Sequence, residues 1–322
     1  MSNLIFGIYP GGMTGSDTGM TSGPPNIPGK ISSALLSLQG PSSLFLVRAY
    51  SGYKGPGAPE NILPEDPGEY VGGNRALDLV LCFQYNDENL SGWKNFIAQN
   101  VTQYNSKIRF LQITEEANVN LPALDGHFAN SRRALVEGVV FAKRFIKERG
   151  LNIEVGFNAT PDFNPNRGFW KEIRSIAKSE FYESLDYVGL DFFPDVFRPL
   201  PRTDGVIDAY DPIRQVITHF QNDIVEAGIR RDIPLHISEN GWPTSESRSE
   251  DDQSMVLGSI IRAIHKLRLE FNIKTYEMFD LRDADSSIDD IFYRFGLMTD
   301  DYTPKPAFDT YRSLISELTE RQ

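Results

Sequence analysis

Eight short apolar runs, spread along the whole chain, restrict its fold more than any other feature. Each run is rich in β-branched and aromatic residues, and most are almost continuously apolar, as in strands that are covered on both faces. The runs occupy residues 4–9, 44–50, 77–85, 108–114, 152–159, 186–193, 233–239 and 273–279. They predict the strands of a buried parallel sheet.

Helical patterns separate these runs. The clearest covers residues 130–149 and ends at Gly150, a residue typical of helix C-termini. Further helices are expected at 32–39, 93–101, 169–183, 213–228 and 253–271, with a last helix from residue 307. Alternating strands and helices in a chain of 322 residues predict an α/β fold, a closed (β/α)8 TIM barrel. No linker divides the chain, so residues 1–322 are expected to form a single domain.

Two segments rich in glycine and proline are too long for tight connections. Residues 10–29 follow the first predicted strand, and residues 51–75 follow the second. Both lie where barrel active sites are built, at the C-terminal ends of the strands. We expect these two long loops to shape a substrate cleft, with decorative insertion as the alternative.

Acidic residues stand at the ends of the fourth and seventh predicted strands. Glu115 and Glu116 follow the run FLQIT, and Glu239 follows the run LHIS. Two carboxyl groups that face each other in a barrel mouth suit glycoside hydrolysis. One protonates the leaving oxygen, and the other attacks the anomeric carbon in enzymes that retain configuration.

These strand ends carry a resemblance to a known group of enzymes. QITEEAN (112–118) resembles the fourth-strand signature of the large clan of retaining (β/α)8 glycoside hydrolases, and ISENGWPT (237–244) is similar to the seventh-strand signature of its plant-type β-glucanases and galactanases. The resemblance implies Glu116 as acid/base and Glu239 as nucleophile. VRAY (47–50) matches the segment whose arginine, here Arg48, binds the nucleophile carboxylate.

The sequence also departs from that pattern. Glu115 stands where the clan has an asparagine, so it either contacts a substrate hydroxyl or pairs with a basic residue as a structural group. The sixth strand ends in Phe192 and Phe193, where the clan supplies a tyrosine to the nucleophile. Phe279 stands where the clan has a tryptophan beneath the sugar. Carboxylates crowded in one mouth repel one another, so at least one pKa should rise.

Other residues at strand ends are candidates for substrate contact. Gln84 and Asn86 end the third strand, and Asp191 lies in the sixth-strand segment. Trp242, after the seventh strand, is either a platform for a sugar ring or a packing residue. Together with Arg48, Glu115 and Phe279, they complete the predicted substrate site.

Charge narrows the range of partners. The net charge is −12, which disfavours nucleic acids and anionic membranes as partners. The histidines show no metal-binding spacing, so we expect no metal and no cofactor. The N-terminal residues lack a signal-like apolar stretch, which favours a cytoplasmic location unless a leader has been removed.

The sequence thus favours an enzyme that hydrolyses β-linked oligosaccharides, polysaccharides or glycosides, acting as a monomer or homodimer. Two alternatives remain open. One is a carbohydrate-binding pseudo-enzyme on the same barrel, for which the altered fourth and sixth strand ends argue. The other is a transglycosylase that uses the same pair of glutamates.

Overall fold

The computed structural model describes residues 4–16, 18–40, 44–86, 88–164, 168–203 and 206–320. Eight parallel strands form a closed barrel, because β1 pairs with β4 on one side and with β13 on the other. The ring runs in the order β1, β13, β12, β9, β8, β7, β6, β4. The strands are β1 (Ile5–Ile8), β4 (Phe45–Tyr53), β6 (Arg75–Phe83), β7 (Ile108–Ile113), β8 (Glu154–Ala159), β9 (Tyr187–Asp191), β12 (Leu235–Asn240) and β13 (Ile273–Met278). All eight predicted strands are confirmed.

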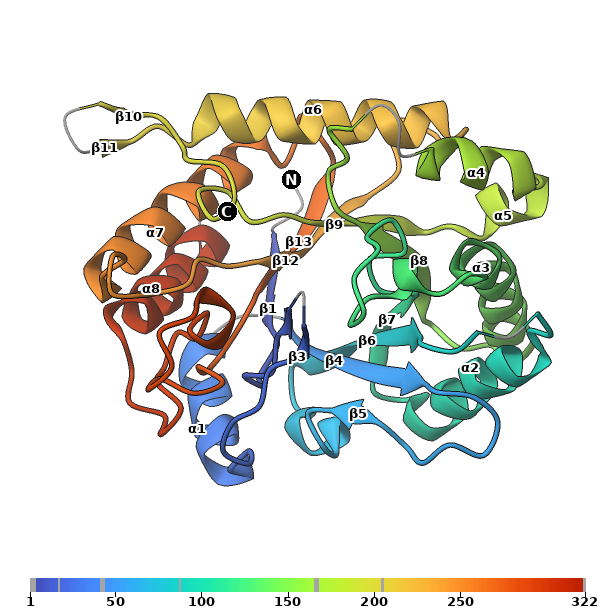
Figure 1. Cartoon of the computed structure of the whole chain (residues 1–322), viewed down its shortest axis with the longest axis horizontal. Helices are drawn as coiled ribbons and strands as arrows, with labels where there is room; N and C mark the ends of the chain where they lie inside the picture. Colours follow the sequence, from blue (N-terminus) through green and yellow to red (C-terminus); the bar gives the residue numbers. More distant parts are fainter. Residues whose placement is uncertain are drawn as a thin grey trace.

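Helices surround this barrel (Figure 1). They are α1 (Pro28–Gln39), α2 (Ser91–Tyr104), α3 (Ser131–Glu148), α4 (Phe169–Ile176), α5 (Ser179–Ser184), α6 (Tyr210–Glu226), α7 (Glu250–Leu267) and α8 (Pro306–Glu320). Local signals explain their limits. The side chain of Ser249 caps α7 by accepting a hydrogen bond of 3.0 Å from the backbone N–H of Asp252. In α3, Leu135, Val139 and Ala142 are buried on the face toward the strands.

Two helix predictions need correction. The helix expected at 169–183 is two helices, α4 and α5, because Ala177 adopts an extended backbone. The strand–helix alternation is also incomplete. Within the described chain, no α-helix connects β4 to β6; the connection holds β5 (Ile62–Leu63) and the 3-10 helix η1 (Pro67–Tyr70). The short η1 packs against α1, β4 and β6, and it buries Tyr70 where a helix would otherwise cover the barrel.

The two predicted long loops are confirmed at the C-terminal end of the barrel strands. The first contains the short antiparallel pair β2 (Gly15–Ser16) and β3 (Gly19–Met20). The second extends β4 to Tyr53 and returns through β5, which pairs antiparallel with β4. A further antiparallel pair, β10 (Arg202–Thr203) and β11 (Val206–Ile207), lies in the connection between β9 and α6.

The barrel interior changes character from one end to the other. Near the N-terminal ends of the strands, Leu46, Phe110 and Tyr187 form a small apolar cluster. Two residues further along the same strands stand Arg48 and Gln112, and four beyond Tyr187 stands Asp191, all buried. Because side chains alternate along a strand, residues two apart share a face. The inward faces of these strands are therefore apolar near their N-terminal ends and polar near their C-terminal ends, where the mouth of the barrel lies.

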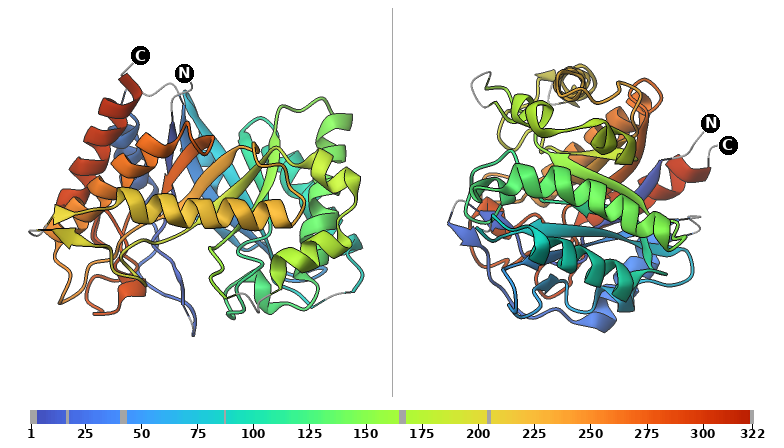
Figure 2. Two further views of the ribbon diagram at one scale, coloured as in Figure 1. Left: turned by 90° about the horizontal axis from the view of Figure 1, so that it is seen from above. Right: turned by 90° about the vertical axis from the view of Figure 1, so that its right-hand side faces the viewer.

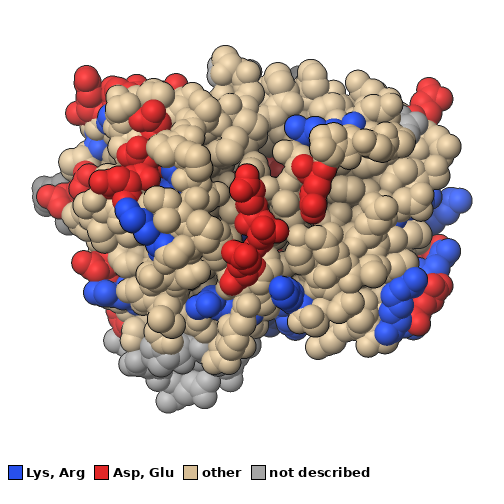
Figure 3. Space-filling view, turned by 90° about the horizontal axis from the view of Figure 1, so that it is seen from below, with Lys and Arg blue, Asp and Glu red and all other residues tan. Residues whose placement is uncertain are grey.

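Both chain ends lie at the same end of the molecule (Figure 2). β1 begins there, and α8 runs back to it. The mouth formed by the C-terminal strand ends is opposite. On the face in Figure 3, acidic side chains gather near the middle and basic ones stand singly or in small groups. No helix in the described ranges is long and apolar enough to cross a bilayer.

Candidate active site

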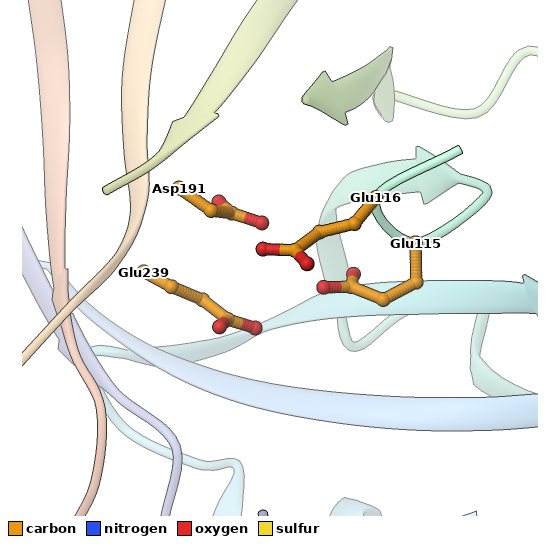
Figure 4. A group of neighbouring side chains, drawn as sticks. All are labelled: Glu115, Glu116, Asp191 and Glu239. Atoms are coloured by element: carbon orange, nitrogen blue, oxygen red, sulfur yellow. The ribbon is translucent and has the colours of Figure 1, made fainter. Parts of the chain in front are cut away.

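Four carboxyl groups meet in the mouth of the barrel (Figure 4). They belong to Glu115 and Glu116 after β7, Asp191 at the end of β9, and Glu239 on β12. One oxygen of each lies within 4.8 Å of one oxygen of every other. All four residues are at most 9% exposed. Carboxylate oxygens are suitable ligands for a hard cation, so these residues are also where a metal ion could be held.

The turn after β7 aims the first two carboxyl groups. Thr114 and Glu116 have positive φ angles of 67° and 44°, so the chain bends sharply as the strand ends. The buried carboxylate of Asp125 fixes this bend by accepting hydrogen bonds from the backbone N–H of Phe83 (2.6 Å) and of Glu115 (2.8 Å). The side-chain oxygen of Asn158 accepts the N–H of Glu116 at 2.8 Å.

An irregularity in β12 directs Glu239 inward. His236 faces the barrel interior, where its ring stacks on Tyr187 at 4.0 Å. If side chains alternated strictly along β12, the odd-numbered residues that follow His236, including Glu239, would point away from the barrel interior. The register with β9 shifts between Ile237 and Glu239, so that Glu239 pairs with Asp191. A bulge of this kind re-aims the residue that follows it, and it brings the Glu239 carboxylate into the cluster.

A hydrogen-bonded chain holds the Glu239 carboxylate. The hydroxyl of Tyr50, on β4, donates a hydrogen bond to Glu239 and accepts one of 2.8 Å from Nε of Arg48. Nε of Arg48 lies 3.6 Å from the same carboxylate oxygen. The other end of the Arg48 guanidinium donates to Asp78 at 2.8 Å and to Gln112 at 3.0 Å. Arg48 is 1% exposed, so its charge acts with little screening by water.

Glu115 is tied to the same network. Its Oε2 accepts hydrogen bonds from Gln112 at 2.7 Å and Asn158 at 3.1 Å, and lies 3.5 Å from Arg48. Asn158 also donates to Asp191. Both alternatives that the sequence left open for Glu115 therefore retain support: one carboxylate oxygen is bound to protein groups, and the residue lines the cavity described below.

Electrostatics distinguish the two central glutamates. Burial raises the pKa of Glu116 well above its usual range, Asp191 and Glu239 raise it further, and Arg48 lowers it only in part. Burial also raises the pKa of Glu239, but Arg48 and the hydrogen bond from Tyr50 oppose the rise. Burial and then Glu239 raise the pKa of Glu115 and of Asp191. A protonated Glu116 beside an ionised Glu239 is the state that this arrangement favours.

The carboxyl cluster forms part of the wall of a cavity of 1040 Å³. Six of the predicted site residues line it: Gln84, Glu115, Glu116, Asp191, Glu239 and Phe279. The ring of Phe279 stacks on Tyr9 with their centroids 5.5 Å apart, and Tyr9 lines the cavity too. The space is large enough for a ligand of several rings.

Comparison with known proteins shows which solved structures share this fold. No family model matches the sequence, and no curated protein matches it. Among solved structures, a family 39 glycoside hydrolase from Bacteroides cellulosilyticus WH2 aligns with a TM-score of 0.65 and 15% identity, over 99% of this chain and 64% of that one. The chain shares its (β/α)8 barrel fold with this protein. It spans less than two thirds of the length of the Bacteroides protein.

Two other solved structures align over most of both chains. A structure from a study of two plant β-glucan endohydrolases gives a TM-score of 0.61 with 14% identity, over 89% of this chain and 96% of that one. A Rhizomucor miehei β-1,3-glucanosyltransferase mutant gives 0.55 with 13% identity, over 94% and 96%. At these identities, the likeness concerns the fold.

Three predicted site residues lie outside the cavity lining. Arg48 lies behind Tyr50 and reaches Glu239 from within the barrel. Asn86 is exposed, and its side-chain oxygen accepts the N–H of Ala129 at 3.1 Å. Trp242 is 3% exposed; its indole N–H donates to Asp195 at 3.1 Å, and Arg248 lies over its ring. Trp242 is thus placed as a packing residue.

The sequence reasoning missed Tyr50, which supplies Glu239 with the hydroxyl that the sixth strand lacks. Its signal was present, because Tyr50 stands two residues after Arg48 and must share its face of β4. Asp78, Gln112 and Asn158 were also missed. They stand inside apolar runs, where only the three-dimensional arrangement reveals which polar residues meet.

Proposed function

We propose that this protein cleaves O-glycosidic bonds with retention of configuration, with Glu239 as nucleophile and Glu116 as acid/base. One observation carries the proposal: an oxygen of Glu116 and an oxygen of Glu239 lie within 4.8 Å of each other in the mouth of the barrel. Retaining glycosidases place their carboxyl groups about 5 Å apart, whereas inverting ones need about 6.5–9.5 Å to admit a water molecule.

The reaction would proceed in two balanced steps. In the first, a carboxylate oxygen of Glu239 bonds to the anomeric carbon while the bond from that carbon to the leaving oxygen breaks. Glu116 gives its proton to that oxygen. In the second, water attacks the anomeric carbon and gives a proton to Glu116, and the ester to Glu239 breaks. The sugar is released, and both residues return to their starting states without a cofactor.

The surrounding residues support this division of roles. Glu239 receives the Tyr50 hydroxyl bond and faces Arg48, both of which favour an ionised nucleophile. Glu116 has Asp191 and Glu239 as its main charged neighbours, and both favour a proton on it. Gln84, Glu115 and Phe279 are the proposed contacts to the sugar in the cavity. We assign the scissile bond to β-linked sugars, from the sequence resemblance.

A screen of 4-nitrophenyl β-glycosides of glucose, galactose, mannose and xylose tests the function. We expect release of nitrophenol with at least one sugar, and ¹H NMR of the first product should show the substrate's anomeric configuration. In the Glu239→Ala variant turnover should vanish, and azide should restore part of it as a glycosyl azide of inverted configuration. An inverted first product in the wild type, or full activity in Glu239→Ala, would refute the assignment.

Transfer to a sugar acceptor is the second candidate. It uses the same covalent intermediate, and the similarity to a β-1,3-glucanosyltransferase over 94% of this chain favours it. Product analysis with added acceptor sugars separates transfer from hydrolysis. A separation of the two carboxyl groups well beyond 6 Å would have favoured a binding-only protein or an inverting mechanism, and the approach within 4.8 Å lends neither that support.

A further inference from the structure

The cavity has two unlike sides. Polar side chains that can bind hydroxyl groups, Lys54, Asn61 and Gln84, come from β4, β5, β6 and the loops around them. A second part of the lining is built by four segments, 119–124, 161–163, 192–200 and 212–216. It meets the polar side where the side-chain amide of Gln84 donates to the backbone oxygen of Ala123 at 3.1 Å. We call these four segments the apolar wall, because most of their cavity-lining residues are leucine, isoleucine, valine, proline or phenylalanine.

Large apolar side chains of this wall are open to solvent. Phe197 is 63% exposed and Phe163 is 41% exposed. Single exposed apolar residues are common, but several that line one cavity indicate a binding surface. A sugar unit needs hydrogen-bond partners for its hydroxyls, and the wall offers few. Among its described polar groups, the Arg198 guanidinium is stacked 4.0 Å from the centre of the Phe163 ring.

Aromatic rings connect the wall to the carboxyl cluster. Phe279, beside Tyr9 in the cavity, contacts the edge of Phe193 at a centroid distance of 6.2 Å. Phe193 in turn contacts Phe197 at 6.5 Å. The apolar surface therefore continues without a break from the floor of the site to the rim of the cavity, and the cavity lining includes all of these residues.

The wall is held in a fixed shape. Asp195 has a φ of 66° and accepts the N–H of Leu200 at 2.7 Å, two bonds from Arg202, and the indole N–H of Trp242. This carboxylate closes segment 192–200 into a compact loop and anchors it to β12's end through Trp242. Such a surface binds an apolar ligand with little loss of chain entropy.

Part of the wall stands next to the acid/base, and segment 192–200 also borders Glu239, because the N–H of Phe192 donates to the backbone oxygen of Glu239 at 3.1 Å. Segment 119–124 follows Glu116 by three residues, and segment 192–200 follows Asp191 directly. A general acid stands beside the bond to the leaving group, so the part of the substrate that departs is the part next to Glu116. The sugar that forms the ester must instead lie against Glu239, beside Tyr50, which donates to that carboxylate.

We propose that the leaving group of the substrate is a large apolar alcohol, so that the protein acts on glycosides with an apolar aglycone rather than on chains of sugars. This inference rests on the proposed function. The carboxyl cluster and polar side would bind one sugar, and the apolar wall would bind the aglycone. Each methylene that leaves water on this wall improves binding by about two- to fourfold.

The test uses ethyl, butyl, hexyl and octyl β-glycosides of the sugar that the nitrophenyl screen selects, together with its glycosyl fluoride. These alcohols differ little in acidity, so chain length changes contact area and hardly changes reactivity. We expect kcat/KM to rise by about two- to fourfold per methylene up to hexyl, mainly through a lower KM. Constant rates along the series, or a β-linked disaccharide that reacts faster than the octyl glycoside, would overturn the inference.

Two variants localise the effect. Phe197→Ser should reduce the gain per methylene, because this ring lies on the wall and is exposed enough for the fold to tolerate its loss. Leu36→Ser is the matched control, since Leu36 is 68% exposed on α1 and lies outside the cavity lining; it should keep the gain. An unchanged gain in Phe197→Ser contradicts the inference.

The glycosyl fluoride distinguishes a failure of this inference from a failure of the proposed function. It carries the sugar and a leaving group without an aglycone, so it requires the nucleophile and not the wall. Turnover of the fluoride with no dependence on chain length would leave the proposed function intact and remove only the apolar aglycone. No turnover of the fluoride or of any glycoside would remove both.

Discussion

The two central glutamates are held in different ways. Glu239 accepts the Tyr50 hydroxyl, faces Arg48, and stands on a barrel strand. Glu116 stands in the turn after β7 with a φ of 44°; its backbone N–H is bound by Asn158, and no group of the described residues is seen to donate to its carboxylate. A nucleophile must keep one position and one charge state. An acid/base must gain and lose a proton, and a less restrained carboxyl group suits that task.

The largest expected effects are losses of kcat, and the loss on replacing Glu116 should depend on the substrate whereas the loss on replacing Glu239 should not. Glu239→Ala should lower kcat by about four to six powers of ten for every substrate, because no nucleophile remains. Glu116→Ala should lower it by about 10²- to 10⁴-fold for alkyl glycosides, whose leaving oxygen needs a proton. For the glycosyl fluoride, Glu116→Ala should cost far less. Steady-state kinetics on both substrates measure this contrast, and equal losses on the two would reverse the role given to Glu116.

Loss of the Tyr50 hydroxyl should weaken the nucleophile end alone. Tyr50→Phe removes a hydrogen bond to a charged group and should lower kcat by about 10- to 100-fold. That bond lowers the pKa of Glu239, so without it the acidic limb of the pH–rate profile should move to higher pH. Tyr53→Phe, on the same strand but outside the site, is the control. A profile that keeps its acidic limb in Tyr50→Phe would assign Tyr50 a purely structural role.

Asp191 should act on the acid/base end. It is the largest charged influence that raises the pKa of Glu116. Asp191→Asn keeps an oxygen to accept the hydrogen bond from Asn158 and removes the charge. The alkaline limb of the pH–rate profile should therefore move to lower pH, because the pKa of Glu116 falls when the neighbouring charge is removed. An alkaline limb that stays in place in this variant would mean that another group carries the proton.

The smallest effect concerns stability. Burial raises the folded-state pKa of Glu115, so the folded protein binds more protons than the unfolded chain above about pH 4.3. The free energy of unfolding should then fall as pH rises through this range. Glu115→Gln should reduce the fall and add about 1 kcal/mol at pH 7, or about 2 °C in Tm. Glu246→Gln, at an exposed site, is the control for thermal melts at pH 5 and 8. A variant less stable than wild type at pH 7 would show that the bonds to Glu115 outweigh its crowding.

Sequence patterns were sufficient for the barrel and for the position of the carboxyl groups. Periodicity reports burial, and all eight apolar runs became strands. The same patterns could not show that β4 and β6 are joined without an α-helix, because η1 is too short to leave a helical period. They also placed Glu239 at a strand end without showing its direction, which depends on the register shift in β12.

The buried polar residues that hold Arg48 were harder to predict from the sequence. Asp78 and Gln112 are single polar residues in apolar strands, and they matter only because closure of the barrel brings both to Arg48. Trp242 illustrates the opposite case. It belongs to the most specific motif in the chain, yet its ring packs inward and its indole N–H binds Asp195. A sequence motif shows which residue type stands at a position. The direction of that side chain depends on the residues that surround it in the folded chain.

The position of the two chain ends has a practical consequence. Both lie at the end of the barrel opposite the mouth (Figure 2). A tether on either end would orient the molecule with its cavity away from a support, so an immobilised preparation should keep the opening free for bulky, poorly soluble compounds. A fluorescent reporter attached there would likewise sit too far from the cavity to touch a ligand inside it.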